Sequence, residues 1–232
     1  MNLCWPASRA CGADVEDLFT NGFPRFEGRF TRTDQIDDPH AVCPARPGRV
    51  PISWALDSSR ARAWTVNGFA DDDGTCRARF RAALHRLQPL PEITQGIRQL
   101  PENTLGVHVR RTDLVLARLT SDDWYFEQVD AALDEGNTTH VFLCSDEPAV
   151  KSAFQARYGQ RLLTYSIDLR PGDHFAHRQS VQGMRDALRD LLTLARTQRI
   201  IGTYNSSFSW LASMWGGVPV VFPQIDEGGP CN

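Results

Sequence analysis

The second half of the chain alternates short apolar segments with amphipathic ones, and this alternation constrains the fold more than any other feature. The apolar segments predict strands at residues 105–109, 140–145, 161–166, 199–203 and 218–222. The segments between them predict helices at residues 122–133, 147–159, 178–197 and 206–216. Strands separated by helices pair in parallel through right-handed crossovers. The sequence therefore predicts an α/β fold with a parallel sheet that carries helices on both faces.

The first hundred residues are less regular. We expect a strand at 2–6, a short helix at 13–19 capped by Asp14, and a helix at 76–88. Residues 20–75 are rich in proline, glycine and aspartate, with short strands expected near "GRF" and "RAWTV". Three prolines between residues 88 and 103 indicate a boundary. We therefore predict a smaller, incomplete N-terminal α/β half at 1–95 and a second domain at 96–232.

Composition excludes several classes of protein. The 232 residues are 41% hydrophobic and 23% charged, which is ordinary for a globular protein. A net charge of −3 provides no overall basic field for nucleic acid or an anionic membrane, so an anion site would have to be local. No apolar stretch reaches the ~18 residues of a membrane-spanning helix. The sequence does not determine an oligomeric state.

The six cysteines are scattered and form no C-x-x-C pair, which argues against a zinc or thioredoxin-type site. Scattered thiols favour a reducing compartment, so we expect a cytoplasmic protein. Cys4 and Cys11 could form a disulfide in a secreted protein, and Asn137 and Asn205 begin glycosylation sequons. A secretory origin, in the lumen of the ER or Golgi, is therefore the alternative.

The segment "HVRRTD", residues 108–113, brings charge to the end of a strand that should be buried. His108 and Arg110 share one face of this strand, and polar side chains are least costly at its carboxyl end, where open α/β sheets bind ligands. Arg110 and Arg111 would form a fork suited to phosphate oxygens, and Asp113 would orient one arginine or act on substrate. In the alternative interpretation, both arginines pair with nearby acids.

A second polar cluster, "GTYNSSFSWLA", follows a predicted strand that ends at Gly202-Thr203. Ser206 or Ser207 would cap the next helix, whose first N–H groups have no partner within the helix. Such a helix start is a ready anion site. Serine and asparagine are also ordinary helix caps, so the cluster alone is compatible with a purely structural role.

Two further stretches can be explained by structural roles alone. Asp186 and Asp190 lie one turn apart in the helix at 178–197, beside arginines, and this pattern is typical of a solvated face with internal ion pairs. Ser145-Asp146 and Glu147-Pro148 form a helix-start signal.

The sequence lacks a Walker phosphate loop, G-x-G-x-x-G, G-x-S-x-G and H-E-x-x-H. His174 and His177 have no obvious third partner, so no metal site is predicted.

The order of "HVRRTD", "FLCSDEP" and "DALRDLLTLARTQRIIGTYNSSFSWLA" resembles the inverting fucosyltransferases. The likeness is to the nodulation-type and core alpha-1,6-fucosyltransferases and, more distantly, to the protein O-fucosyltransferases. The resemblance implies a GT-B architecture of two Rossmann-like halves, with the N-terminal half on the acceptor side. It also implies GDP-fucose as the donor, a glycan or glycoprotein as the acceptor, and no metal or other cofactor.

The resemblance also implies roles for individual residues. Arg110 would bind the donor diphosphate, with Arg111 beside it and Asp113 near the reacting atoms. His108 and Asp190 would approach the guanine. The phosphate pocket would be lined by Thr203, Ser206 and Ser207, and Phe208 would also contact the nucleotide sugar. Cations aimed at a departing phosphate stabilise the charge that develops there, so paired arginines could replace a metal in this role.

The chain departs from the family pattern in three places. Leu114 stands where core fucosyltransferases carry a lysine, and Arg118 stands where they carry a carboxylate. The chain also begins at what resembles the family's second strand, so we expect an N-terminus that lacks the Gly-x-Gly-Asn-Arg helix. Two alternatives follow: a nucleotide-sugar-binding protein without turnover, or a GT-B enzyme for another nucleotide sugar. The acceptor base is unassigned among Asp113, Asp122, Asp123 and Glu127.

Overall fold

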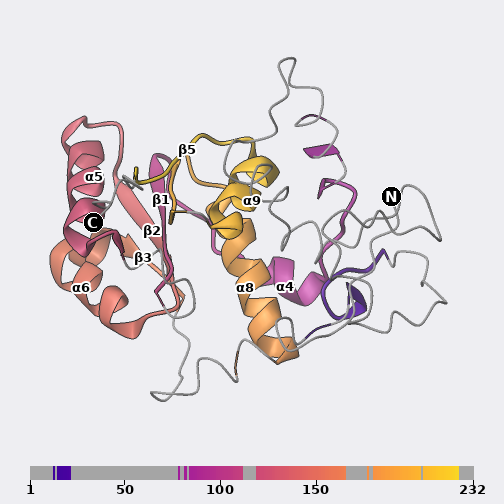
Figure 1. Ribbon diagram of the computed structural model, residues 1–232. Helices are drawn as coiled ribbons and strands as arrows, with labels where there is room; N and C mark the ends of the chain where they lie inside the picture. Colours follow the sequence, from indigo (N-terminus) through magenta and orange to yellow (C-terminus); the bar gives the residue numbers. More distant parts are fainter. Residues whose placement is uncertain are drawn as a thin grey trace, which may run out of the picture. The chain divides into compact units, whose positions relative to one another are not determined.

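The computed structural model describes residues 13, 15–21, 78, 81–82, 84–111, 119–165, 177, 180–204 and 206–224 (Figure 1). The strands expected at 2–6, near "GRF" and near "RAWTV" lie outside these residues. Contacts between Cα atoms divide the chain into two units. The first comprises Met1–Ile93 and Phe175–Arg185, and the second Thr94–His174 and Asp186–Asn232. The division into domains at 1–95 and 96–232 stays a prediction.

The second unit contains a five-stranded parallel sheet in the order β3-β2-β1-β4-β5. Its strands are β1 (Thr104–Val109), β2 (His140–Ser145), β3 (Leu162–Leu163), β4 (Ile200–Ile201) and β5 (Val220–Val221). The chain runs outward from β1 through β2 to β3, then crosses back and runs outward again through β4 to β5. This is the strand order of a Rossmann-like, doubly wound sheet, with its topological switch point between β1 and β4. The predicted α/β class and parallel sheet are confirmed, while the GT-B pairing of two halves stays a prediction.

Right-handed crossovers place the helices of the two outward runs on opposite faces of the sheet. Helices α5 (Asp122–Asp134) and α6 (Pro148–Tyr158) follow β1 and β2, and α8 (Val181–Leu194) and α9 (Ser207–Gly216) follow β3 and β4. Figure 1 shows α5 and α6 on one side of the strands and α9 on the other. All four helices fall inside, or within one residue of, the predicted ranges.

Local signals in the sequence explain where these helices begin and end. The Ser121 hydroxyl caps α5 by accepting a hydrogen bond from the Trp124 N–H at 3.2 Å. Helix α6 begins with Pro148 in its first turn, where the missing N–H is not needed. Helix α9 ends before Gly217, whose φ of 67° lies in the left-handed region that favours glycine.

The two faces of β1 pack against different kinds of side chain. Leu105, Val107 and Val109 point to the α5 and α6 side, where they join a buried apolar cluster that includes Tyr125 and Phe154. Gly106 lies on the other face, and a Cβ added there would come within 2.6 Å of the Thr197 Oγ1. The glycine therefore allows the chain after α8 to approach the strand closely.

The described part of the first unit is short. A 3₁₀ turn, η1 (Val15–Asp17), occupies the middle of the helix predicted at 13–19, so the structure is shorter than expected. Phe19 forms an antiparallel bridge with Pro89, next to helix α4 (Pro91–Gln95), which the sequence did not predict. Within the predicted helix at 76–88, the described residues 78, 81, 82 and 84 are helical. No helix in the described ranges is long and apolar enough to cross a membrane.

Candidate functional site

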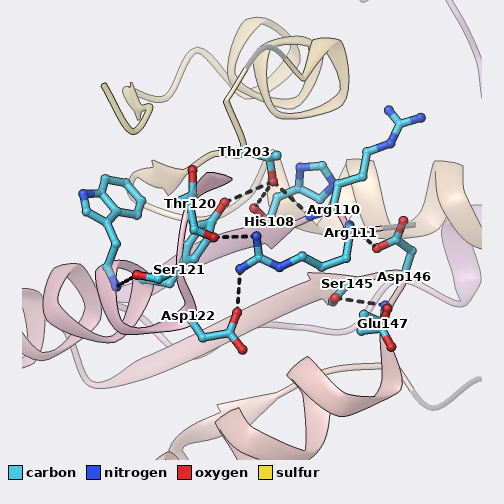
Figure 2. Close-up of polar contacts among 12 residues, drawn as sticks. His108, Arg110, Arg111, Thr120, Ser121, Asp122, Ser145, Asp146, Glu147 and Thr203 are labelled. Carbon is cyan, nitrogen blue, oxygen red and sulfur yellow. Dashed lines mark hydrogen bonds and ion pairs between the residues drawn. The ribbon is translucent and has the colours of Figure 1, made fainter. Parts of the chain in front are cut away.

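Thr203 joins the carboxyl ends of β1 and β4 by hydrogen bonds at the switch point of the sheet. The fully buried Thr203 hydroxyl donates to the His108 carbonyl at 2.7 Å and accepts from the Arg110 backbone N–H at 3.0 Å (Figure 2). Three of the residues singled out from the sequence therefore meet at one point. Strand ends on either side of a switch point form the crevice where open α/β sheets bind ligands.

The hydrogen bonds of Thr203 give it a positioning role. Its single hydroxyl hydrogen goes to the His108 carbonyl, and the Tyr125 hydroxyl donates to the same oxygen at 3.4 Å. A threonine hydroxyl has one donor, so in this arrangement Thr203 has no hydrogen to offer a phosphate. Instead it fixes the backbone that carries Arg110.

His108 is a buried, neutral imidazole. Its side chain is 7% exposed, its Nδ1 lies 2.7 Å from the Ser209 Oγ, and its ring centroid lies 4.7 Å from that of Phe208. Burial lowers the pKa of His108 to about 3, with a further contribution from the Arg110 charge that the carboxylate of Asp146 partly opposes. Near neutral pH, the ring therefore carries a single proton.

The start of α9 carries a buried polar group that no described residue contacts by a hydrogen bond. Ser206 occupies the N-cap position, but its hydroxyl makes no capping hydrogen bond. The residue is 4% exposed, and within the described part of the chain its Oγ has no hydrogen-bond partner. Ser207 and Phe208 begin the helix and are half-buried. A buried hydroxyl without a partner is costly, so a ligand atom that bonded to it would offset a real penalty.

The side chains of the two adjacent arginines extend in different directions (Figure 2). The Arg111 guanidinium pairs with the Asp122 carboxylate at 2.5 Å and donates to the Thr120 carbonyl at 2.6 Å, while its backbone N–H donates to Asp146 at 2.8 Å. Its side chain is 13% exposed. In Figure 2 the Arg110 side chain extends away from this group, on the side of His108 and Thr203. The ion-pair interpretation is therefore confirmed for Arg111.

Asp190 lies on α8 over the same face of the sheet as His108. Its carbonyl accepts a hydrogen bond from the Cys144 thiol at 3.7 Å, and Cys144 sits directly across from His108 in the β1–β2 register. Burial raises the pKa of Asp190 to about 7, although the charges of Lys151 and Arg189 oppose the shift. No described residue donates a hydrogen bond to its carboxylate.

The neighbouring acid behaves differently. Asp186 pairs with Arg189 at 3.1 Å within α8, as expected for internal ion pairs on a helix. The internal ion pair predicted for Asp186 is therefore confirmed, but the solvated face is wrong for this residue, because Asp186 is buried. Asp190 has the raised pKa that is common at functional sites.

The acceptor base stays unassigned. Asp113, together with Leu114 and Arg118, lies outside the described residues. Asp122 is held by Arg111, and Asp123 and Glu127 are exposed on α5. Among the residues that the structure describes, no group of three or more His, Cys, Asp or Glu side chains could hold a metal ion. The prediction of a metal-independent reaction is not tested by this observation.

Sequence reasoning missed Ser209, which is fully buried at the centre of the polar cluster. Its hydroxyl contacts His108 and accepts the Thr203 N–H at 3.2 Å. A Cβ added at Gly202 would lie 2.9 Å from the Ser209 Cβ, so that glycine allows α9 to sit this close to β4. The available signal was a third serine, three residues after Ser206, on the helix face that turns towards the sheet.

No known protein-family profile matches the chain. No curated protein sequence matches it either. Among solved structures, the chain is similar to apo POFUT1 at 14% identity, over 63% of this chain and 50% of that one, with a TM-score of 0.44. It is also similar to the fucosyltransferase NodZ from Bradyrhizobium at 20% identity, over 55% of this chain and 43% of that one, with a TM-score of 0.39.

A third similar structure, NodZ alpha-1,6-fucosyltransferase soaked with GDP-fucose, has 18% identity, a TM-score of 0.47, and coverage of 81% of this chain and 68% of that one. The chain thus spans about half the length of the first two proteins. The fold and the site rest on the strands, helices and contacts of this chain.

Proposed function

We propose that the chain is a glycosyltransferase that transfers fucose from GDP-fucose to a glycan or glycoprotein acceptor, with inversion and without a metal. The observation that carries the proposal is the buried Ser206 hydroxyl at the start of α9, beside the switch point, which has no hydrogen-bond partner among the described residues. A helix N-terminus next to a sheet switch point favours a phosphate group. The choice of GDP-fucose comes from the motif resemblance.

In this proposal Arg110 and the start of α9 bind the diphosphate. The Thr203 hydroxyl fixes the Arg110 backbone, so the side chain extends from a defined point at the edge of the sheet. A guanidinium can bond two phosphate oxygens at once, and its charge stabilises the negative charge that builds on GDP as the sugar leaves. Ser206 adds a hydroxyl donor from the segment that follows β4, the strand next to β1.

Asp190 is our candidate for recognition of the guanine. A carboxylate can accept two parallel hydrogen bonds, and guanine offers two neighbouring donors, its N1–H and its 2-amino group. The Asp190 residue is half-buried, and its carboxylate has no hydrogen-bond donor among the described residues, so a base with two donors would satisfy it. His108, on the adjacent strand and the same face, would contact the same base.

A second function, nucleotide-sugar binding without turnover, is favoured by the position of Arg111. Its guanidinium is engaged by Asp122 and the Thr120 carbonyl, so this arrangement does not direct two cations at one phosphate. Binding of GDP needs one well-placed cation, whereas departure of GDP from the sugar benefits from more positive charge. Turnover therefore separates the two functions.

The test uses the full chain and has two parts. We expect GDP to raise the melting temperature more than UDP or CMP does, and a larger shift with UDP would contradict the choice of donor. GDP release from GDP-fucose is then measured with and without oligosaccharide acceptors, in the presence of EDTA. Acceptor-dependent release supports a metal-independent transferase. GDP binding without any release identifies the binding protein instead.

A further inference from the structure

Ser209 links three elements at the site through one hydroxyl. Its Oγ lies 2.7 Å from the His108 Nδ1 on β1, and it accepts a hydrogen bond from the Thr203 N–H, just after β4, at 3.2 Å. Ser209 itself is on α9 and is fully buried. Its hydrogen bonds therefore form away from water, where an unsatisfied group would be costly.

Counting hydrogens decides the direction of the bond to His108. The Thr203 N–H can only donate, so it uses one acceptor position of the Ser209 hydroxyl. If His108 also donated to Ser209, the serine hydrogen would need another acceptor, and no described residue provides one. If Ser209 donates to Nδ1 instead, every group in the chain of bonds is satisfied. The neutral ring then carries its proton on Nε2.

We propose that Ser209 is a positioning residue that fixes His108 in the tautomer with the proton on Nε2, so that the site presents an N–H donor to its ligand. The only hydrogen bond of the His108 ring to a described residue is the one at Nδ1, so Nε2 is left for a ligand. Ser209 thus acts through His108 and need not touch the ligand.

The fixed tautomer has a consequence for base selection, which rests on the proposed function. His108 supplies a donor, and Asp190 supplies an acceptor on the same face of the sheet, one strand away. Guanine presents an acceptor, O6, next to a donor, N1–H. Adenine presents the opposite order, a donor amino group next to an acceptor nitrogen. The pair therefore matches guanine, and Ser209 helps to reject adenine by preventing His108 from acting as an acceptor.

The first test measures the tautomer by ¹⁵N NMR of the histidine side chains in the ligand-free protein. We expect the His108 Nε2 to be protonated and Nδ1 to carry a lone pair that accepts a hydrogen bond. Ser209→Ala should shift the Nδ1 resonance towards that of a nitrogen without a bond. Ser213→Ala is the matched control, because Ser213 is a buried serine one turn along α9 that bonds the Val218 carbonyl. A wild-type His108 protonated on Nδ1 would overturn the proposal.

The second test compares GDP with 6-thio-GDP, in which sulfur replaces O6 and accepts hydrogen bonds poorly. Wild-type protein and Ser213→Ala should prefer GDP by about fivefold, the size of one hydrogen bond. Ser209→Ala should lose most of this preference. An unchanged preference in Ser209→Ala, or an equal loss in Ser213→Ala, would contradict the role of Ser209. Failure of wild-type protein to bind GDP would refute the proposed function, and the NMR result would still decide the tautomer.

Discussion

The two faces of the central sheet differ sharply in what they bury. On the side of α5 and α6, Val107 and Val109 pack with Tyr125 and Phe154 in a fully buried apolar cluster. On the opposite side, the same strand presents His108 to Ser209, and Asp190 lies over the next strand. Because successive side chains of a strand alternate between faces, one segment of five or six residues can serve both purposes. The comparison indicates that the first face stabilises the fold, and we propose that the second binds ligand.

The largest effect is expected from a substitution in the apolar face, and it is a loss of folding stability. Phe154→Ala removes a fully buried ring from α6 and should lower the free energy of unfolding by about 3–5 kcal/mol. Urea denaturation measures the loss. GDP affinity of the molecules that remain folded, measured at low temperature, should be nearly unchanged. A loss of affinity comparable to that of a site variant would show that the faces are not separate.

The next largest effect is expected from a substitution at the polar face, and it is a loss of GDP affinity with the fold intact. Arg110→Ala should weaken GDP binding about 100-fold and abolish transfer, because a charge-assisted pair to phosphate is lost. Arg110→Lys should also fail, since a point charge does not reproduce a bidentate contact. Calorimetric titration with GDP measures the affinity, and thermal unfolding checks the fold. Wild-type activity in Arg110→Ala would refute the site assignment.

Arg111 provides the matched control for Arg110. Arg111→Ala breaks the partly exposed pair with Asp122 and a bond to the Thr120 carbonyl, so we expect a stability loss of about 1–2 kcal/mol. GDP binding should fall much less than in Arg110→Ala. Equal losses of affinity in the two variants would mean that Arg111 turns to the ligand when GDP binds.

GDP affinity should depend on pH through Asp190, on the polar face of the sheet. The pKa of Asp190 is raised to about 7, so near neutral pH a substantial fraction of the carboxyl is protonated and cannot accept both guanine donors. GDP affinity should therefore rise as pH increases through 7, by up to about tenfold per pH unit below the pKa. Titrations between pH 5.5 and about 8.5 measure this dependence, and Asp190→Asn should remove it.

Folding stability should show the opposite trend for this group. The folded protein raises the pKa of Asp190 above that of the unfolded chain, so protonation favours the folded state. Its contribution is most favourable at low pH, and the penalty grows as pH rises from the unfolded pKa to about 7. Asp190→Asn should gain stability relative to wild type at pH 8 but not at pH 4. His108 contributes with the opposite sign, because its pKa falls from 6.5 to about 3 on folding and the unfolded imidazole takes up a proton first as pH drops below 6.5. The difference between Asp190→Asn and wild type isolates the contribution of Asp190.

The smallest expected effect has opposite signs for stability and binding. Ser206→Ala removes a buried hydroxyl without a described partner, so stability should stay the same or rise by up to about 1 kcal/mol. GDP affinity should fall about fivefold, because the phosphate loses one donor. Chemical denaturation and calorimetry measure the two quantities. A loss of stability with unchanged affinity would give Ser206 a structural role.

Much of the sheet could be predicted because its signals are local. The period of two in "LGVHV" and the capping signals at Ser121 and Pro148 set β1, α5 and α6 to within one or two residues. Strands β3, β4 and β5 came out shorter than predicted, with two residues each in ladders. Periodicity reports burial, whereas ladder length depends on where neighbouring strands diverge, and a single segment holds no information on that.

The site could be predicted only in outline. The segment order placed His108, Arg110 and Thr203 at one edge of the sheet, because carboxyl ends of parallel strands meet there. Nothing local separated Arg110 from Arg111, since the pairing of Arg111 with Asp122 depends on how the start of α5 packs. Ser209 was missed for the same reason. Its contact with the His108 ring spans 101 positions of sequence, so no local pattern could reveal it.

The central claim is that Arg110 and the start of α9 form a diphosphate site, and a titration of the full chain with GDP followed by backbone amide NMR tests it most directly. We predict that the amides of Arg110, Ser206, Ser207 and Phe208 shift together along one saturable curve. Saturable shifts confined to the opposite edge of the sheet, or no shifts at millimolar GDP, would contradict the claim.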